Sequence, residues 1–212
     1  MKKAWASASL LALCWLAFQA APLSAQEWDD DWDFYMMDAY ARGDQAISFS
    51  VGFSFPALFL FRDGAGGLER RPHGWRPVGG TLSISYDYFL GPRLFVGGEV
   101  GVKFNGTIGG NSVFIIPIGA RVGFQPAFRR FEFPLCLTFG IAPQRHMDDS
   151  LTGMFAKAGA SAFFRFNADW SFGLSAEWSW YPQRPRVDGR REPSMNADGS
   201  VVGATLSVRY HF

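Results

Sequence analysis

The chain alternates large apolar residues with small or polar ones in eight separate segments, and a period of two is that of a β-strand. In the first segment, Phe49, Val51 and Phe53 are separated by Ser50 and Gly52. The predicted strands, in chain order, are 46–56, 78–90, 94–104, 112–124, 131–142, 153–166, 170–181 and 200–212. The sixth has the weakest pattern, because alanines replace larger apolar residues on one of its faces.

The charged residues inside these segments all lie on the small, polar face. They are Asp87, Glu99, Lys103, Arg121, Glu132, Lys157, Arg165, Glu177 and Arg209. A soluble sandwich also alternates, but its large apolar side chains face inward. Here the large apolar face is rich in aromatic residues. The same partition would arise if the polar face met water, so it predicts a lipid-facing exterior and a charged lumen only together with the signal peptide described below. A basic residue at the middle of the lipid face would cost roughly 2–4 kcal/mol.

The predicted connections are short at one end of the strands and mostly longer at the other. Residues 91–93 and 167–169 form short turns, whereas 60–77 and 182–199 form long loops. Bacterial membrane barrels show this asymmetry, with the short turns in the periplasm. Open sheet edges do not persist in lipid, so the first strand should pair with the last. The pattern predicts an all-β fold, an eight-stranded antiparallel up-and-down transmembrane β-barrel.

The first 25 residues have the layout of a secretory signal peptide. Lys2 and Lys3 precede an apolar run at 10–18 that is too short to span a bilayer, and small residues follow it. The predicted segments are therefore a signal peptide (1–25), an acidic aromatic N-terminal segment (26–45) and the barrel (46–212). Apolar residues in 26–45 have helical spacing, which predicts either an amphipathic helix at the periplasmic side or a disordered tail.

The amino-acid composition argues against several classes of function. Of the 20 basic residues, 18 remain after Lys2 and Lys3 are removed, against 19 acidic ones, so no net field favours nucleic acid. Cys136 is the one cysteine after residue 25, which excludes an intrachain disulfide in the processed chain. We expect no cofactor and no metal, because the histidines lack ligand spacing.

The final strand ends in Tyr210 and Phe212. This ending resembles the C-terminal assembly signal of bacterial outer-membrane barrels, which implies that the barrel assembly machinery recognises it. Together with the signal peptide and the eight alternating segments, residues 46–212 resemble the eight-stranded outer-membrane barrel superfamily that includes the OmpA transmembrane domain, OmpX and OmpW. The resemblance implies a place in the bacterial outer membrane, in contact with its lipid, but no motif selects a subfamily.

The lumen and the loops suggest two functions. An eight-stranded barrel has room only for its own side chains, and its inward charges have both signs, which predicts a salt-bridged plug. Arginines enrich the two longest loops: Arg62, Arg70, Arg71, Arg76, Arg184, Arg186, Arg190 and Arg191. We therefore expect a non-enzymatic barrel with a structural or surface-interaction role, its basic extracellular loops contacting anionic lipid or glycan. The alternative is a narrow conduit for small or hydrophobic molecules, as the OmpW resemblance allows.

Catalysis has little support in the sequence. The compact set of reactive side chains within 146–150 combines a histidine, two aspartates and a serine, but its Asp-Asp-Ser run is also ordinary turn chemistry. We therefore expect no enzymatic activity.

Overall fold

The computed structural model describes residues 40–62, 68–70, 74–146, 149–183, 186–187, 190–191 and 197–212. In these ranges the regular structure is entirely β. The strands are β1 (Gln45–Arg62), β2 (Leu68–Arg70), β3 (Gly79–Phe89), β4 (Leu94–Gly106), β5 (Ser112–Ile115), β6 (Ile118–Phe124), β7 (Ala127–Phe128), β8 (Phe131–Glu132), β9 (Leu135–His146), β10 (Asp149–Arg165), β11 (Trp170–Gln183), β12 (Arg186–Val187), β13 (Arg190–Arg191) and β14 (Ala197–His211). The predicted signal peptide and most of the predicted 26–45 segment lie outside the described residues.

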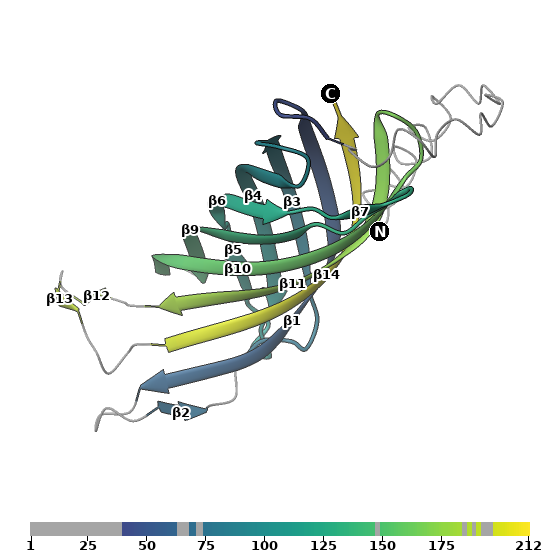
Figure 1. The fold of residues 1–212 in the computed structure, drawn as a ribbon. Coiled ribbons are helices and arrows are strands. Elements are labelled where there is room, and N and C mark those ends of the chain that lie inside the picture. Colours follow the sequence, from purple (N-terminus) through teal and green to yellow (C-terminus); the bar gives the residue numbers. More distant parts are fainter. Residues whose placement is uncertain are drawn as a thin grey trace, which may run out of the picture. The chain divides into compact units, whose positions relative to one another are not determined.

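The sheet closes into a barrel of eight antiparallel crossings, as predicted (Figure 1). Around the wall the order is β1, β3, β4, β5 with β6, β9, β10, β11 and β14, and β14 pairs with β1. That last pairing runs from Ala46 opposite His211 to Phe61 opposite Ala197. The strands β2, β7 and β8 are short additions to the wall, and β12 pairs with β13 in a separate sheet.

Prolines explain two differences from the predicted strands. The predicted strand 112–124 is interrupted between β5 and β6 at Pro117, which has no backbone N–H to donate to a ladder. The predicted strand 131–142 begins only at Leu135, directly after the buried Pro134. Residues 131–132 instead form β8, which pairs with β7 and β10.

Several strands run further toward the long loops than alternation indicates. β1 continues to Arg62, and β9 and β10 continue into the region expected to be a loop. His146, at the end of β9, is paired in register with Asp149, at the start of β10. The predicted loop at 143–152 is therefore largely the end of a β-hairpin.

The outer face of the barrel carries the large apolar residues. Leu174 and Leu206 each have 64% of their surface exposed, and Phe53 has 61%. Aromatic residues stand near both ends of this face, with the Trp170 and Tyr210 rings 4.9 Å apart near the short turns. Such an exterior is stable only against hydrocarbon, so the barrel spans a membrane.

The inner face is not uniformly small and polar, contrary to our expectation. Four phenylalanines that point inward and are at least 93% buried each stand opposite a glycine on the neighbouring strand: Phe59 opposite Gly199, Phe95 opposite Gly123, Phe155 opposite Gly140 and Phe163 opposite Gly173. A β-carbon at Gly173 would lie 2.8 Å from the Phe163 ring. The glycines therefore leave the space that the inward rings fill.

Candidate functional site: the barrel lumen

All nine charged residues predicted to face the lumen are joined by ion pairs in one continuous chain, which we call the lumen ladder. In order from the long-loop end it runs Lys103, Glu177, Lys157, Glu99, Arg121, Asp87, Arg209, Glu132 and Arg165. The sign of the charge alternates at every step. Each carboxylate therefore lies between two cations, as buried charges require.

The middle of the ladder is the most tightly joined part. Lys157 Nζ pairs with both Glu99 and Glu177, and its distance to Glu177 Oε2 is 3.1 Å. Lys103 Nζ pairs with the other oxygen of Glu177. Thr138 donates to Glu99 Oε2 at 3.4 Å, which ties β9 to the ladder although β9 carries none of its charges.

The contact between Lys157 and Glu177 arises differently from the sequence-based expectation. A turn centred at residue 167 predicts that the two residues stand directly opposite each other. In the structure, Lys157 is opposite Ser179 and Glu177 is opposite Gly159. The Asn167 side chain accepts from the N–H groups of Asp169 and Trp170, at 3.0 and 2.8 Å, and the hairpin centres one residue later. Lys157 and Glu177 are therefore diagonal neighbours.

The short-turn half of the ladder is built around Asp87 and Glu132, which are each 1% exposed. Asp87 lies between Arg121 Nε, at 3.0 Å, and Arg209 Nη2, at 3.8 Å. Glu132 lies between Arg209 and Arg165, at 3.5 and 3.6 Å. Arg209 also donates to Ser48 Oγ of β1 at 3.0 Å, so the closing strand pair is tied to the same network.

Aromatic rings cover the arginines in this half. The guanidinium carbon of Arg209 lies 4.1 Å from the centre of the Phe163 ring, and that of Arg121 lies 5.4 Å from Phe95. A ring face attracts a cation, more strongly where water is excluded. The inward phenylalanines therefore both fill space and stabilise ladder cations.

Tyr40, which precedes the first strand, occupies the short-turn mouth. Its ring is 2% exposed and stacks on Phe89 with centroids 3.8 Å apart. Its hydroxyl donates to Glu132 Oε2 at 2.9 Å and lies 3.0 Å from His211 Nδ1, and burial raises the pKa of Tyr40. Nothing in the alternation pattern marks this residue, because it belongs to no strand.

His211 also lies 2.8 Å from Ser171 Oγ through its other ring nitrogen. A serine beside a histidine has the geometry of a nucleophile and its base. Ser171, however, has no exposed surface, and the pair lies within the barrel beneath Tyr40, so no substrate has access to it. The arrangement satisfies buried polar groups in the manner of a structural network.

The long-loop mouth is closed by an apolar layer. Phe155, Tyr181 and Val201 pack there with residues of β5 and β9, and Trp75 packs against the cluster from the loop after β2. The Trp75 ring meets Phe59 edge-on at 5.0 Å. The N–H of Arg76 donates to the Gly106 carbonyl at 2.6 Å, which holds this loop segment to the β4–β5 hairpin.

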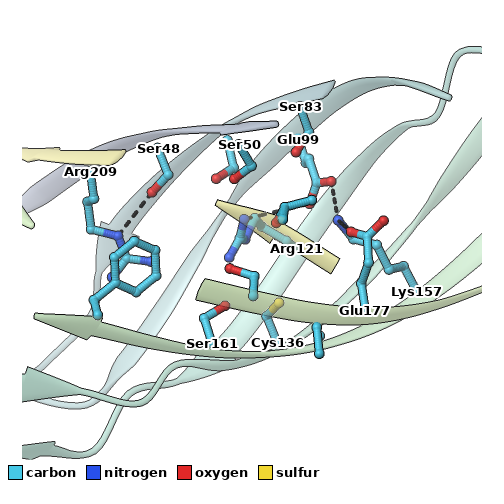
Figure 2. A pocket seen from close by; sticks show the side chains of 16 residues that line it. Ser48, Ser50, Ser83, Glu99, Arg121, Cys136, Lys157, Ser161, Glu177 and Arg209 are labelled. Atoms are coloured by element: carbon cyan, nitrogen blue, oxygen red, sulfur yellow. Dashed lines mark hydrogen bonds and ion pairs between the residues drawn. The ribbon is translucent and has the colours of Figure 1, made fainter. Parts of the chain in front are cut away.

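Between the two closed ends lies a polar cavity of about 40 Å³. Figure 2 shows Ser50 and Ser83 on one of its walls, Cys136 and Ser161 on the opposite wall, and the ladder side chains between them. This volume has room for about three water molecules. The described part of the lumen therefore contains a small polar chamber with room for a few water molecules.

The remaining residues singled out in the sequence lie at the two ends. Tyr210 and Phe212 face outward with rings 5.9 Å apart, and the Phe212 backbone exchanges two 3.0 Å hydrogen bonds with Gln45. Among the loop arginines, Arg76 is exposed, Arg71 and Arg184 lie outside the described residues, and the others fall within strands: Arg62 (β1), Arg70 (β2), Arg186 (β12), Arg190 and Arg191 (β13). The His146–Ser150 set spans the β9–β10 turn, and Met147 and Asp148 lie outside the described residues.

Two features are not found in the part of the chain that the structure describes. It holds no cluster of three or more histidine, cysteine or acidic side chains able to bind a metal. It also holds no helix long and apolar enough to cross a membrane.

The comparisons with known proteins agree with this architecture. A protein-family model matches residues 27–210. An "Uncharacterized protein" of Treponema pallidum (strain Nichols) is 30% identical over 134 residues, which are 63% of this chain and 59% of that relative's length. Neisserial surface protein A has a similar structure, with a TM-score of 0.57 and 9% identity over 80% of this chain and 99% of its own. OprG of Pseudomonas aeruginosa gives a TM-score of 0.46 and 10% identity over 82% and 97%.

The membrane-facing exterior, the closed wall and the likeness to Neisserial surface protein A confirm the fold expected from the sequence. This chain belongs to the family whose model matches residues 27–210, and its fold is that of the eight-stranded transmembrane β-barrels.

Proposed function

We propose that this protein is a non-enzymatic, closed outer-membrane barrel with a structural or surface-interaction role. The observation that carries the proposal is the lumen ladder, an unbroken chain of paired charges between an apolar layer at one mouth and Tyr40 at the other. A lumen filled in this way has no continuous column of water for ions to follow. The protein would then act through its outer ends rather than through its interior.

The basic loops are the part that would meet a partner. Guanidinium groups pair well with phosphate, sulfate and carboxylate oxygens. We infer that the loop arginines contact anionic lipid or an acidic glycan at the cell surface, and that Tyr210 and Phe212 serve the barrel assembly machinery.

A narrow conduit is the second candidate. The polar cavity of about 40 Å³ favours it, because serine hydroxyls line a polar chamber beside the ladder. Rearrangement of a few ion pairs would join this chamber to one of the mouths.

Recording from the refolded full chain in planar bilayers separates the two candidates. The closed barrel should give little or no steady conductance. Large, stable, ohmic channels from the unmodified protein would contradict it and favour the conduit.

Retention on dextran sulfate tests the surface role, with neutral dextran as the control. Nanodiscs that carry the protein should bind the sulfated matrix, and changing Arg62, Arg70, Arg71 and Arg76 together to Gln should weaken that binding. Equal retention of the two proteins would remove these arginines from the proposal.

A further inference from the structure

The hairpin of β7 and β8 at the short-turn end carries an unusual arginine. Arg129 is the first residue of its two-residue turn and has a φ of +53°. It is the one residue other than glycine with positive φ in the described ranges. Glycine or asparagine adopts this conformation more readily. A residue in such a disfavoured conformation points to a role for its side chain.

A surface of phenylalanines surrounds this turn. Phe128 is 68% exposed, and the Phe131 ring lies 6.4 Å from Phe133 and 5.5 Å from Phe164. The exposed rings near this end of the wall are Phe124, Phe128, Phe131, Phe133, Phe164 and Phe166. They continue the membrane-facing exterior, so acyl chains should reach the hairpin.

Positive charge stands at the edge of this apolar surface. The guanidinium carbon of Arg129 lies 5.8 Å from the centre of the Phe128 ring. The backbone carbonyl of Arg93, in the neighbouring turn, accepts a 2.7 Å hydrogen bond from the Gln125 N–H, which places this second arginine beside the base of the hairpin. Both arginines are exposed, and neither forms an ion pair with another described residue.

The acidic residue nearest to Arg129 along the hairpin already has its own ion-pair partners. Glu132, three residues after Arg129, is buried and pairs with Arg209 and Arg165 inside the barrel. The exterior of the hairpin therefore combines an aromatic platform with guanidinium groups that have no described carboxylate partner.

We propose that Arg129 and Arg93 form a binding site for the phosphodiester headgroup of an anionic phospholipid in the periplasmic leaflet. Short turns of bacterial barrels lie in the periplasm, which puts this hairpin at the depth of that leaflet's headgroups. The acyl chains would lie on the phenylalanine surface, and the guanidinium groups would hold the phosphate oxygens, a pairing that also supplies charge complementarity.

The test uses the full chain in nanodiscs of equimolar phosphatidylglycerol and phosphatidylcholine. Native mass spectrometry of the released barrel measures the ratio of the two lipids that remain bound. The unmodified protein should retain phosphatidylglycerol several-fold over its share of the bilayer. R129N and R93Q should lower the ratio toward that of the bilayer, whereas R129K should keep most of it.

Two controls distinguish a loss of lipid binding from a loss of folding. R129N replaces a disfavoured turn residue with a favoured one, so its urea midpoint should not fall even as lipid preference falls. I108N changes an exposed residue of the turn between β4 and β5, at the opposite end, and should leave the ratio unchanged. Equal retention of the two lipids by the unmodified protein, or an unchanged ratio in both R129N and R93Q, would overturn the proposal.

Discussion

At the scale of single residues, the most informative side chain is one outside the strands. Tyr40 closes the short-turn mouth with one ring and one hydroxyl, and its hydrogen bonds reach Glu132 of the ladder and His211 of the last strand. A single residue thereby couples the segment before the barrel to the state of the lumen. Cys136, which lines the polar cavity, offers a chemical probe of that state.

Removing the Tyr40 ring should expose the cavity. In the refolded chain carrying Cys14→Ser, a small charged thiol reagent should modify Cys136 slowly. Tyr40→Ala should speed that modification, because it removes the stacked ring together with the hydroxyl. Tyr40→Phe keeps the ring and loses only hydrogen bonds worth roughly 1 kcal/mol each. If all three proteins react at the same rate, Tyr40 does not close the mouth.

Deleting Phe212 should impair assembly more than stability. The side chain is 54% exposed, so its packing is worth less than the roughly 1.5–3 kcal/mol of a fully buried phenylalanine. The amount of folded barrel in the outer membrane should fall, while urea unfolding of refolded protein should change little. Phe212→Tyr is the matched control and should assemble. Normal outer-membrane levels of the deletion variant would exclude a role in recognition.

At the scale of the elements, alternation identifies the barrel strands but not their stagger. It places residues on a face, and every ladder residue lies on the face that alternation assigns. It does not say which inward charges meet, because that depends on hairpin registers such as the one set by Asn167. The breaks at Pro117 and Pro134 follow from the missing N–H and could be anticipated. The position of Tyr40 in the lumen mouth could not be anticipated, since a period of two carries no information about residues outside strands.

The inward phenylalanines were missed for a different reason. Phe95, Phe155 and Phe163 lie on the face that we described as small and polar, and Phe59 lies beyond the predicted end of its strand. Phe95 opposite Gly123 and Phe163 opposite Gly173 show the signal that could reveal them, a large inward residue aligned with glycine on the next strand. Reading that signal requires the register first.

Two lysines of the ladder form a matched pair for measuring how much its ion pairs contribute to the free energy of unfolding. Lys157 pairs with two glutamates, whereas Lys103, at the end of the ladder, pairs with one. Lys157→Met should lower the free energy of unfolding by roughly 3–5 kcal/mol, as expected when a buried pair loses one partner. Lys103→Met changes the net charge equally and should cost less, because Glu177 keeps Lys157. Urea unfolding in lipid vesicles measures both, and equal losses would show that position in the ladder does not matter.

At the scale of the whole molecule, the wall and the lumen follow opposite rules. The wall turns aromatic and aliphatic groups outward to lipid, while the interior stacks an apolar layer, a charged and hydroxyl-lined middle and an aromatic layer around Tyr40. Sealing therefore depends on the sum of three layers rather than on one constriction. The two mouths close by different means, which allows each to be opened separately by mutation.

Breaking the ladder at its centre should produce openings that we do not expect from the unmodified barrel. Glu99 joins Lys157, Arg121 and Thr138, so Glu99→Ala separates the two halves of the ladder and leaves their cations facing the polar cavity. Planar-bilayer recordings should then show brief current steps. Glu99→Gln keeps the volume and should open less often. Silent recordings from Glu99→Ala would mean that the apolar layers seal the barrel by themselves.

The alternating order of charge in the ladder also bears on how the chain reaches its fold. A strand that slips by two residues keeps its apolar side chains outward, so the hydrophobic pattern alone does not reject the error. The slip moves each lumen charge by roughly 7 Å along the strand, beyond the reach of its partners. It would bury like charges together and leave others single, at a cost of several kcal/mol per ion. Misaligned closures should thus be penalised from inside the barrel, so the ladder favours the native register of strand pairing in addition to stabilising the folded lumen.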